Sequence, residues 1–171
     1  MSYAIVYDSR TGNTEALARA VAAALPSEGR LAFGRVDEVD RAAVAQADRV
    51  YAGFWTTRGD CGDELAEVLA SLADKDVFLF GTAGFGADET YFAGVMARVA
   101  VHLPESARIV GTFMCQGRMP ASVRARYAQT AEAKPEQAAR MHQLIENFDE
   151  AASHPDDDDL ARLREAVQAA S

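Results

Sequence analysis

The chain alternates between two kinds of apolar pattern. Short runs rich in β-branched and aromatic residues have the character of buried strands, whereas longer segments carry apolar residues every three or four positions, which is typical of amphipathic helices. The strand-like runs are Tyr3–Tyr7, Arg30–Val36, Arg49–Phe54, Asp76–Thr82 and Arg108–Cys115. Of these, Asp76–Thr82 has the clearest pattern of a buried strand.

A predicted helix follows each of the first four strands. A short one is expected over Arg41–Ala47. The other three have one apolar face each, formed by Leu17, Ala18, Val21, Ala22 and Leu25, by Leu65, Val68, Leu69 and Leu72, and by Phe92, Val95, Met96, Val99 and Leu103. Because right-handed crossovers place helices over both faces of a parallel sheet, this alternation predicts a three-layer α/β/α fold. A ligand should then lie beyond the carboxyl ends of the strands.

The last third of the chain has helical patterns only. Met119, Val123 and Tyr127 fall on one helical face, and Pro135 is expected at the start of the next helix. Two further stripes consist of Met141, Leu144, Ile145 and Phe148, and of Leu160, Leu163 and Val167.

We expect residues 1–171 to form a single domain, with a C-terminal helical extension, 119–171, packed on it. Four consecutive aspartates, Asp156–Asp159, precede the last apolar stripe. They could form a metal or partner site, but the favoured interpretation is that they cap the last helix and interact with its dipole.

Composition narrows the classes of function. Apolar residues make up 49% and charged residues 25% of the chain, as in ordinary globular proteins. The formal net charge of −9 argues against binding to nucleic acid or anionic membranes, which would repel the chain. No apolar run approaches a membrane span, and Cys61 and Cys115 lie far apart, outside any spacing typical of a zinc site. We therefore expect a cytoplasmic protein that holds no metal.

The strongest motif is the loop between the first strand and the first helix, Ser9-Arg10-Thr11-Gly12-Asn13-Thr14. Hydroxyl groups at three positions and free N–H groups at a helix start make an anion site. Gly12 lets the backbone approach a ligand closely and adopt a positive φ. A Walker A loop would need a lysine after its last glycine, and the GxGxxG dinucleotide pattern is also missing. The alternative is a polar turn that only caps the helix.

This loop resembles the phosphate loop of the flavodoxin family, in which the pattern Ser/Thr-x-Thr-Gly-x-Thr follows the first strand. Two further segments resemble the family in order and spacing: Gly53–Asp60 after the third strand and Phe80–Gly86 after the fourth. The similarity covers roughly residues 3–115. It implies a flavodoxin-like fold with a five-stranded parallel sheet in the order 2-1-3-4-5 and non-covalently bound FMN.

The resemblance also implies which residues bind FMN. The phosphate would be held by Ser9, Arg10, Thr11, Gly12, Asn13 and Thr14, and the isoalloxazine ring would be lined by Trp55, Thr56, Thr57, Arg58 and Gly59 and by Thr82, Ala83, Gly84, Phe85 and Gly86. Gly59 resembles the glycine whose carbonyl group can turn to accept a hydrogen bond from N5 of the reduced flavin. That contact favours the one-electron reduced form.

No residue is expected to act as a catalytic acid, base or nucleophile. Cys61 has an acidic neighbour, Asp60, which should raise the pKa of the thiol and make it a poor nucleophile. The acids Asp63 and Glu64 open a predicted helix, where acids are common. The three histidines fall on predicted helices or at a helix start, outside the loops at the strand ends: His102, His142 and His154.

Three functions remain open. The favoured one is an FMN-binding electron carrier that shuttles electrons between redox partner proteins. We call the two segments that would line the isoalloxazine ring, Trp55–Gly59 and Thr82–Gly86, the ring loops. Five acids lie in or just after them and would suit a partner with a basic docking face: Asp60, Asp63, Glu64, Asp88 and Glu89. The second is an FMN-dependent reductase that acts directly on a small substrate such as a quinone or tetrapyrrole. The third, a non-redox module of the receiver type, would need an acidic pocket and a lysine near the strand ends, and neither is found.

Overall fold

The computed structural model describes residues 1–86 and 88–171. Its central element is a five-stranded parallel sheet in the order β2-β1-β3-β4-β5, which confirms the expected architecture and strand order. The strands are β1 (Tyr3–Tyr7), β2 (Arg30–Arg35), β3 (Arg49–Trp55), β4 (Asp76–Ala83) and β5 (Arg108–Gln116). Every predicted strand is present, and its ends lie within one residue of the prediction.

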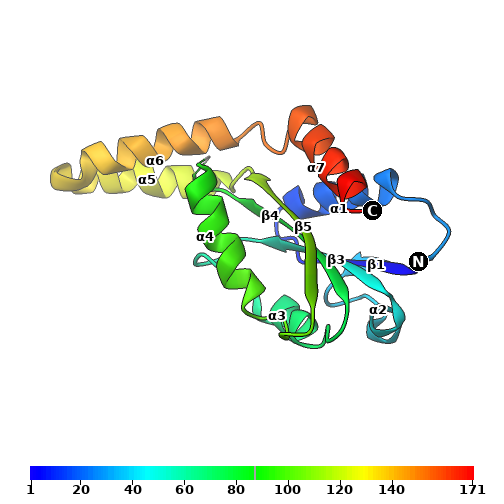
Figure 1. The fold of residues 1–171 in the computed structure, drawn as a ribbon. Helices are drawn as coiled ribbons and strands as arrows, with labels where there is room; N and C mark the ends of the chain where they lie inside the picture. The colour runs from blue at the N-terminus through cyan, green and yellow to red at the C-terminus, as the bar shows by residue number, and fades with distance from the viewer. Residues whose placement is uncertain (87) are drawn as a thin grey trace.

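Helices cover both faces of the sheet (Figure 1). They are α1 (Asn13–Ala24), α2 (Arg41–Gln46), α3 (Asp63–Ala70), α4 (Glu89–Ala100), α5 (Ala121–Ala133), α6 (Ala138–Ala151) and α7 (Asp157–Ala169). Buried residues of α1 and α7 pack on one face, and those of α2, α3 and α4 pack on the other. None of the described helices combines the length and the apolar character needed to span a bilayer.

Alternating side chains of β4 supply both halves of the core. Val77 and Leu79 lie in the cluster under α2, α3 and α4, whereas Phe78 and Phe80 lie in the cluster under α1 and α7. This follows from the two-residue period of a strand, which points successive side chains to opposite faces. All four are at most 1% exposed, so each contributes about 1.5–3 kcal/mol of apolar burial. A central strand that is apolar on both faces explains why β4 had the clearest sequence pattern.

Helices α5 and α6 form an antiparallel hairpin that projects beyond the sheet (Figure 1). Pro135 begins a short 3₁₀ turn, η1 (Pro135–Gln137), and α6 begins only after it, three residues later than expected. Met119 precedes α5 and does not belong to it. An ion pair between Arg124 and Asp149 joins the two helices, with 2.7 Å between Nε and Oδ1. None of the residues of α5, all of which the structure describes, is buried.

The run of aspartates starts α7 as expected. The side chain of Asp156 accepts a hydrogen bond from the backbone N–H of Asp159, and the Asp159 side chain accepts one from the backbone N–H of Asp156. This reciprocal capping box satisfies two N–H groups that the helix itself leaves free. Leu163 and Val167 then pack in the core beside α1.

Candidate functional site

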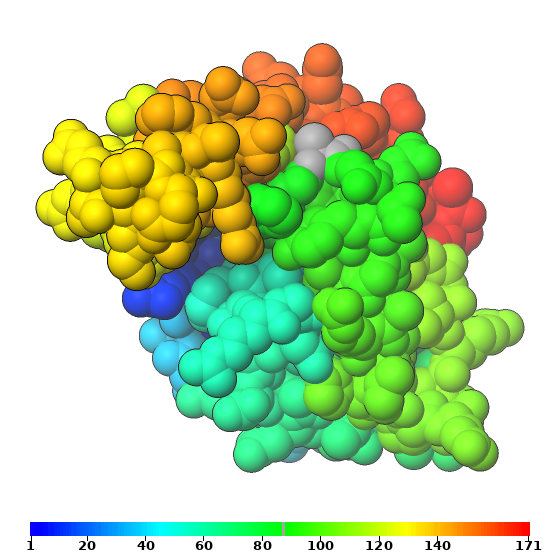
Figure 2. Space-filling view, turned by 90° about the vertical axis from the view of Figure 1, so that its left-hand side faces the viewer, coloured from blue at the N-terminus to red at the C-terminus, as the bar shows by residue number. Residues whose placement is uncertain are grey.

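The carboxyl ends of β1, β3, β4 and β5 share one edge of the sheet because all the strands are parallel. Figure 2 faces this edge, where the segments after β1 (dark blue) and β3 (cyan) lie beside the start of α4 (green) and the α5–α6 hairpin (yellow and orange). The three segments that the sequence assigns to a cofactor therefore lie together.

The loop after β1 leaves backbone donors free at the start of α1. Gly12 has φ +86° and no side chain to cap the helix. Within the described chain, the backbone N–H groups of residues 11–14 donate no hydrogen bond, whereas that of Glu15 donates to Oγ of Ser9 at 3.2 Å. Free N–H groups at a helix start, reinforced by the helix dipole, form a binding site for an anion such as a phosphate.

Two polar side chains of this loop join it to its neighbours. The Thr14 hydroxyl is fully buried and lies 3.2 Å from the hydroxyl of Thr82 at the end of β4. The Asn13 amide donates to the carbonyl of Arg118 at 2.9 Å, next to Gly117, where a Cβ atom would lie 2.5 Å from Asn13 Nδ2. A side chain at position 117 would therefore displace the Asn13 amide, and with it the hydrogen bond to Arg118.

Trp55, the last residue of β3, lies against the same loop. Its indole N–H donates to the carboxylate of Asp8 at 2.9 Å, and the guanidinium of Arg10 lies 5.6 Å from the centre of its ring. These contacts fix the plane of the indole and place a cation over its face. The sequence therefore brings an aromatic ring and an anion-binding loop to the same place.

The segment after Trp55 forms a tight turn. Thr57 and Asp60 exchange backbone hydrogen bonds of 2.9 and 3.0 Å, and both central residues have positive φ, 52° for Arg58 and 80° for Gly59. Two consecutive positive φ angles are typical of a type I′ turn. The carbonyl of Gly59 accepts a hydrogen bond of 3.0 Å from Arg98 Nη1 at the end of α4.

The segment after β4 is held by a residue of the hairpin. Thr82 and Ala83 are buried as the last residues of the strand, and the chain then turns outward at Gly84. Oδ1 of Asn147 accepts from the backbone N–H of Gly86 at 3.1 Å, and its Nδ2 donates to the carbonyl of Gly84 at 2.9 Å. Asn147 therefore connects α6 to the expected ring loop.

Phe85, at the tip of this segment, is an exposed aromatic residue. Its side chain is 51% exposed and meets Tyr91 edge-on at 5.9 Å between ring centres. Phe85 is therefore available to a flat ligand or to a partner at the end of β4.

Three residues of this edge were not identified from the sequence: Arg98, His102 and Asn147. His102 was expected on a helix away from the loops, but α4 ends at Ala100, and Nε2 of His102 lies 3.1 Å from a carboxylate oxygen of Asp60. Each of these residues contacts a loop that is distant in sequence, so no local pattern indicates its role.

Neither cysteine has the properties of a nucleophile. Burial, followed by the nearby charge of Asp60, raises the pKa of the Cys61 thiol to about 12, in the direction expected from the sequence. Burial likewise raises the pKa of Cys115. Both thiols are therefore protonated at neutral pH.

Two hollows lie on the described surface near the sheet. One, of about 450 Å³, borders the loop after β1 between Ser9, Arg35 and Trp55. The other is an open groove of about 880 Å³ along the edge strand β5, lined in part by Phe92 and Arg162. The smaller hollow adjoins the first residues of the loop after β1 and is also lined by acids of neighbouring segments, among them Asp37 and Asp63. The larger one lies beside the sheet edge, and its lining includes no residue of the loop after β1.

The polar atoms of the site fit a phosphorylated ligand with a flat polar ring. Besides the free N–H groups, two buried oxygens have no hydrogen-bond partner in the described chain: Oδ1 of Asn13 and Oγ1 of Thr56. Buried polar atoms without partners are costly, so a ligand that contacts them gains affinity. Fold and site thus define a doubly wound α/β protein with a loop of free backbone N–H donors at the point where the strand order reverses.

The comparisons with known proteins identify the family. The chain belongs to the flavodoxin domain family, whose model matches residues 4–168. This is an FMN-binding family with redox roles, and the expected resemblance is confirmed.

Similar proteins cover nearly the whole chain. A flavodoxin-like domain-containing protein, BilS, from Clostridium symbiosum (strain WAL-14163) is 37% identical over 177 residues, with 96% of this chain and 93% of the relative covered. A BilS protein from Clostridioides difficile (strain CD3) is 27% identical, with 94% and 90% covered. Oxidised Flavodoxin 2 from Bacillus cereus has the same fold, with a TM-score of 0.57 at 17% identity and 99% and 97% covered.

Proposed function

We propose that the chain binds FMN without a covalent bond and carries electrons between redox partner proteins. The observation that carries this proposal is the joining of the loop Ser9–Thr14, with its free N–H groups, to Trp55 and to the end of β4. Bound FMN would take up and release one or two electrons. The protein supplies the site and its electrostatics.

The loops have separate tasks in this proposal. Backbone N–H groups of residues 11–14 hold the phosphate, together with the hydroxyls of the loop. Trp55 and Phe85 flank the ring from the segments after β3 and β4. Arg98 donates a hydrogen bond to the Gly59 carbonyl, so a rotation of the Gly59–Asp60 peptide that points this carbonyl elsewhere would break that hydrogen bond. Arg98 therefore influences how readily the Gly59 peptide turns.

A second candidate, an FMN-dependent reductase that acts on a small substrate, is favoured by one observation. The α5–α6 hairpin is tied to the segment after β4 through Asn147 and lies on the same face as the loops (Figure 2). A wall beside the ring loop can enclose a substrate, whereas a carrier needs only an accessible edge. The electron carrier remains the favoured function because the candidate acids in the described loops, Asp8, Asp60 and Asp88, already have hydrogen-bond partners within the fold.

Calorimetric titration of the flavin-free protein with FMN and with riboflavin tests the cofactor. If the loop after β1 binds the phosphate, FMN binds at least about 100-fold more tightly, because several charge-assisted hydrogen bonds are lost with riboflavin. Equal affinities would reject the phosphate site.

Anaerobic stepwise reduction then separates the two roles. Accumulation of the one-electron reduced form supports the carrier. Rapid oxidation of NAD(P)H that depends on an added quinone, with no such accumulation, supports the reductase.

We further propose that the carrier's partner presents a basic docking face. Asp63, Glu64 and Glu89 are exposed in the first turns of α3 and α4, next to the two ring loops. Two arginines, Arg58 and Arg98, are also exposed there and partly offset these acids. The attraction of a basic partner therefore depends on the excess of acids at this face and on the net charge of −9 of the whole chain.

A further inference from the structure

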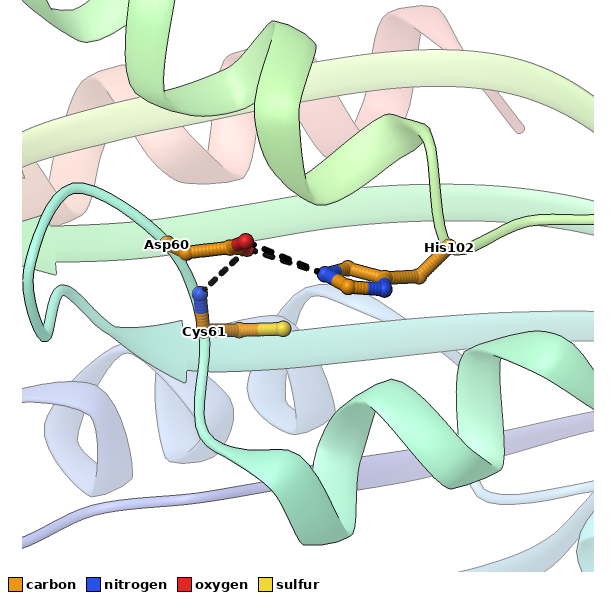
Figure 3. A group of neighbouring side chains, drawn as sticks. All are labelled: Asp60, Cys61 and His102. Atoms are coloured by element: carbon orange, nitrogen blue, oxygen red, sulfur yellow. Dashed lines mark hydrogen bonds and ion pairs between the residues drawn. The ribbon is translucent and has the colours of Figure 1, made fainter.

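Three side chains of types that commonly bind metal ions converge at the turn after β3. Asp60 and Cys61 belong to the turn, and His102 belongs to the connection between α4 and β5 (Figure 3). One potential ligand atom from each lies within 4.8 Å of the other two. Nε2 of His102 is 3.1 and 3.2 Å from the two carboxylate oxygens of Asp60. Figure 3 shows the Cys61 side chain extending toward the imidazole ring, alongside that of Asp60.

These distances suit a tetrahedral metal ion after small movements. Zinc binds cysteine sulfur at about 2.3 Å, histidine nitrogen at about 2.0–2.1 Å and carboxylate oxygen at about 2.0–2.2 Å. Those bond lengths place neighbouring donor atoms between about 3 and 4 Å apart. The observed nitrogen–oxygen distance of 3.1 Å is already in that range. The Cys61 sulfur lies within 4.8 Å of the other two donor atoms, so it would have to move by about 1 Å on metal binding.

The surroundings leave one position open. Cys61 is 7% exposed, whereas the side chains of His102 and Asp60 are 33% and 38% exposed, so the cluster has a buried and an open side. The backbone N–H of Cys61 donates to Oδ1 of Asp60 at 2.8 Å, which orients the carboxylate as an outer hydrogen bond does in metal sites. Asp8 adds further negative charge near the sulfur.

A second cluster with similar residue types has no free carboxylate at its centre. His154 and Asp156 lie near Asp159, which is 1% exposed and already accepts from the backbone of Asp156 and from His154 at 2.5 Å. The guanidinium of Arg162 is also paired with Asp159 and supplies a positive charge that a cation would have to displace. Asp159 is therefore committed to the start of α7.

We propose that Asp60, Cys61 and His102 form a binding site for one zinc-like divalent metal ion, with water as the fourth ligand. The sulfur binds as thiolate, so the thiol proton passes to solvent as the metal–sulfur bond forms. Three protein ligands and one water is the arrangement of zinc sites that keep a position open. The ion would link the turn after β3 to the connection after α4.

Titration of the flavin-free protein with Co²⁺, a coloured substitute for Zn²⁺, tests the site directly. One equivalent should produce visible absorption typical of tetrahedral coordination and a sulfur-to-cobalt band, and Zn²⁺ should abolish both. Cys61→Ser should remove the sulfur band, and His102→Gln should weaken binding by about 100-fold or more, because even outer-shell changes cost 10–100-fold.

Matched controls separate this site from other donors. Cys115→Ser removes the other buried thiol, and His154→Gln disrupts the second cluster; both should leave the cobalt spectrum unchanged. Thermal unfolding without metal checks that each variant is folded. A protein that shows no cobalt absorption, or a spectrum that survives Cys61→Ser, overturns the proposal. Loss of the spectrum in His154→Gln alone also overturns it, in favour of the second cluster.

A consequence that rests on the proposed function concerns coupling to FMN. The metal would fix Asp60, which adjoins Gly59, so metal and FMN should change each other's affinity by the same factor. FMN titrations with and without Zn²⁺ measure that factor in the wild type and in Cys61→Ser. A protein that binds cobalt but not FMN refutes the cofactor proposal and leaves the metal site standing.

Discussion

Gly12 gives the loop between β1 and α1 a backbone conformation that other residues rarely adopt. Its φ of +86° lies in the left-handed region, and a Cβ atom added there would meet no other atom within 4 Å. The cost of a side chain at this position is therefore in the backbone alone. Gly94, inside α4, also has open space around it but has an ordinary helical φ. Because an added Cβ has room at both positions, a comparison of the two glycines measures the effect of backbone strain without an effect of crowding.

Gly12→Ala is expected to lower the free energy of unfolding by about 1–2 kcal/mol, because L residues are strained in the left-handed region. FMN affinity should fall more than riboflavin affinity, since in the proposed function this loop binds the phosphate. Gly94→Ala should instead raise the free energy of unfolding by about 0.5–1 kcal/mol. Urea denaturation and flavin titrations measure both effects, and a stabilising Gly12→Ala would contradict the assigned backbone role.

The residues predicted from sequence and those missed differ in how local their contacts are. The loop Ser9–Thr14 was predictable because hydroxyls, a glycine and a helix start are adjacent in the chain. Arg98, His102 and Asn147 act on residues that are 39, 42 and 61 positions away, respectively. Such contacts depend on how α4 and α6 are placed, and apolar periodicity does not contain that information.

At the scale of elements, Asn147 holds the α5–α6 hairpin against the body of the protein. Its side chain bonds the backbone at Gly84 and Gly86, and its oxygen also accepts from Gln116 Nε2 at 3.2 Å. Met119, which precedes α5, packs against Gly84, where a Cβ atom would lie 2.4 Å from its Cγ. The hairpin and the ring loop therefore support each other.

Replacing Asn147 with alanine removes these three hydrogen bonds. We expect the amide of Gly86 to exchange with solvent at least about tenfold faster, as one lost bond corresponds to roughly 1–1.5 kcal/mol. FMN affinity should fall as the loop loses order. Gln143→Ala removes an exposed amide from the same helix and serves as the control. Unchanged exchange at Gly86 would show that the loop holds its shape without the hairpin.

The strands were predictable because a parallel sheet buried on both faces needs continuous apolar runs. Val77 to Phe80 shows the pattern most clearly. The hairpin was visible as two helical stripes, but its position was not, because α5 buries no residue fully and its contacts with α6 are partly polar. Helix packing on a sheet is specified by apolar faces, whereas the direction of a projecting hairpin depends on a few polar contacts such as those of Asn147.

At the scale of the whole molecule, one carboxylate joins the amino ends of three strands. Asp76 at the start of β4 bonds Arg108 on β5, with two contacts of 2.8 Å, and Arg49 on β3 at 3.3 Å. Arg49 also donates to the carbonyl of Ala170 after α7. Burial alone would raise the pKa of Asp76, but the hydrogen bonds from Arg108 and Arg49 reverse this and lower it.

Asp76→Asn should reduce the free energy of unfolding at pH 7 by about 1.5–3 kcal/mol, because Arg49 is left buried without its charged partner. A lowered pKa means that the ion pair stabilises the fold above the ordinary value of 3.8 and that this contribution is lost as pH falls below it. The difference between wild type and variant should therefore shrink in acid. A pH-independent difference in denaturation experiments would argue against the charge as its cause.

The proposed basic partner leads to a prediction about electrostatic steering by the whole surface. Transfer to a basic acceptor such as cytochrome c should slow as salt rises, because screening shortens to about 8 Å at physiological ionic strength. Neutralising acids beside the ring loops should flatten this dependence: Asp63→Asn, Glu64→Gln and Glu89→Gln. Three exposed acids on α7 provide the matched control: Asp157→Asn, Asp158→Asn and Glu165→Gln. Stopped-flow rates that respond only to the α7 set would move the docking face to the C-terminal helix.

The hairpin begins and ends at nearly the same point. The backbone N–H of Arg118 donates to the carbonyl of His154 at 2.9 Å, so the chain leaves the sheet after β5 and returns beside its point of departure. An insertion with adjoining ends can lengthen, shorten or change its surface between species without altering the path of the chain through the core. Natural variation in this family should therefore accumulate in the hairpin, which makes it the part of the protein best suited to the evolution of new recognition.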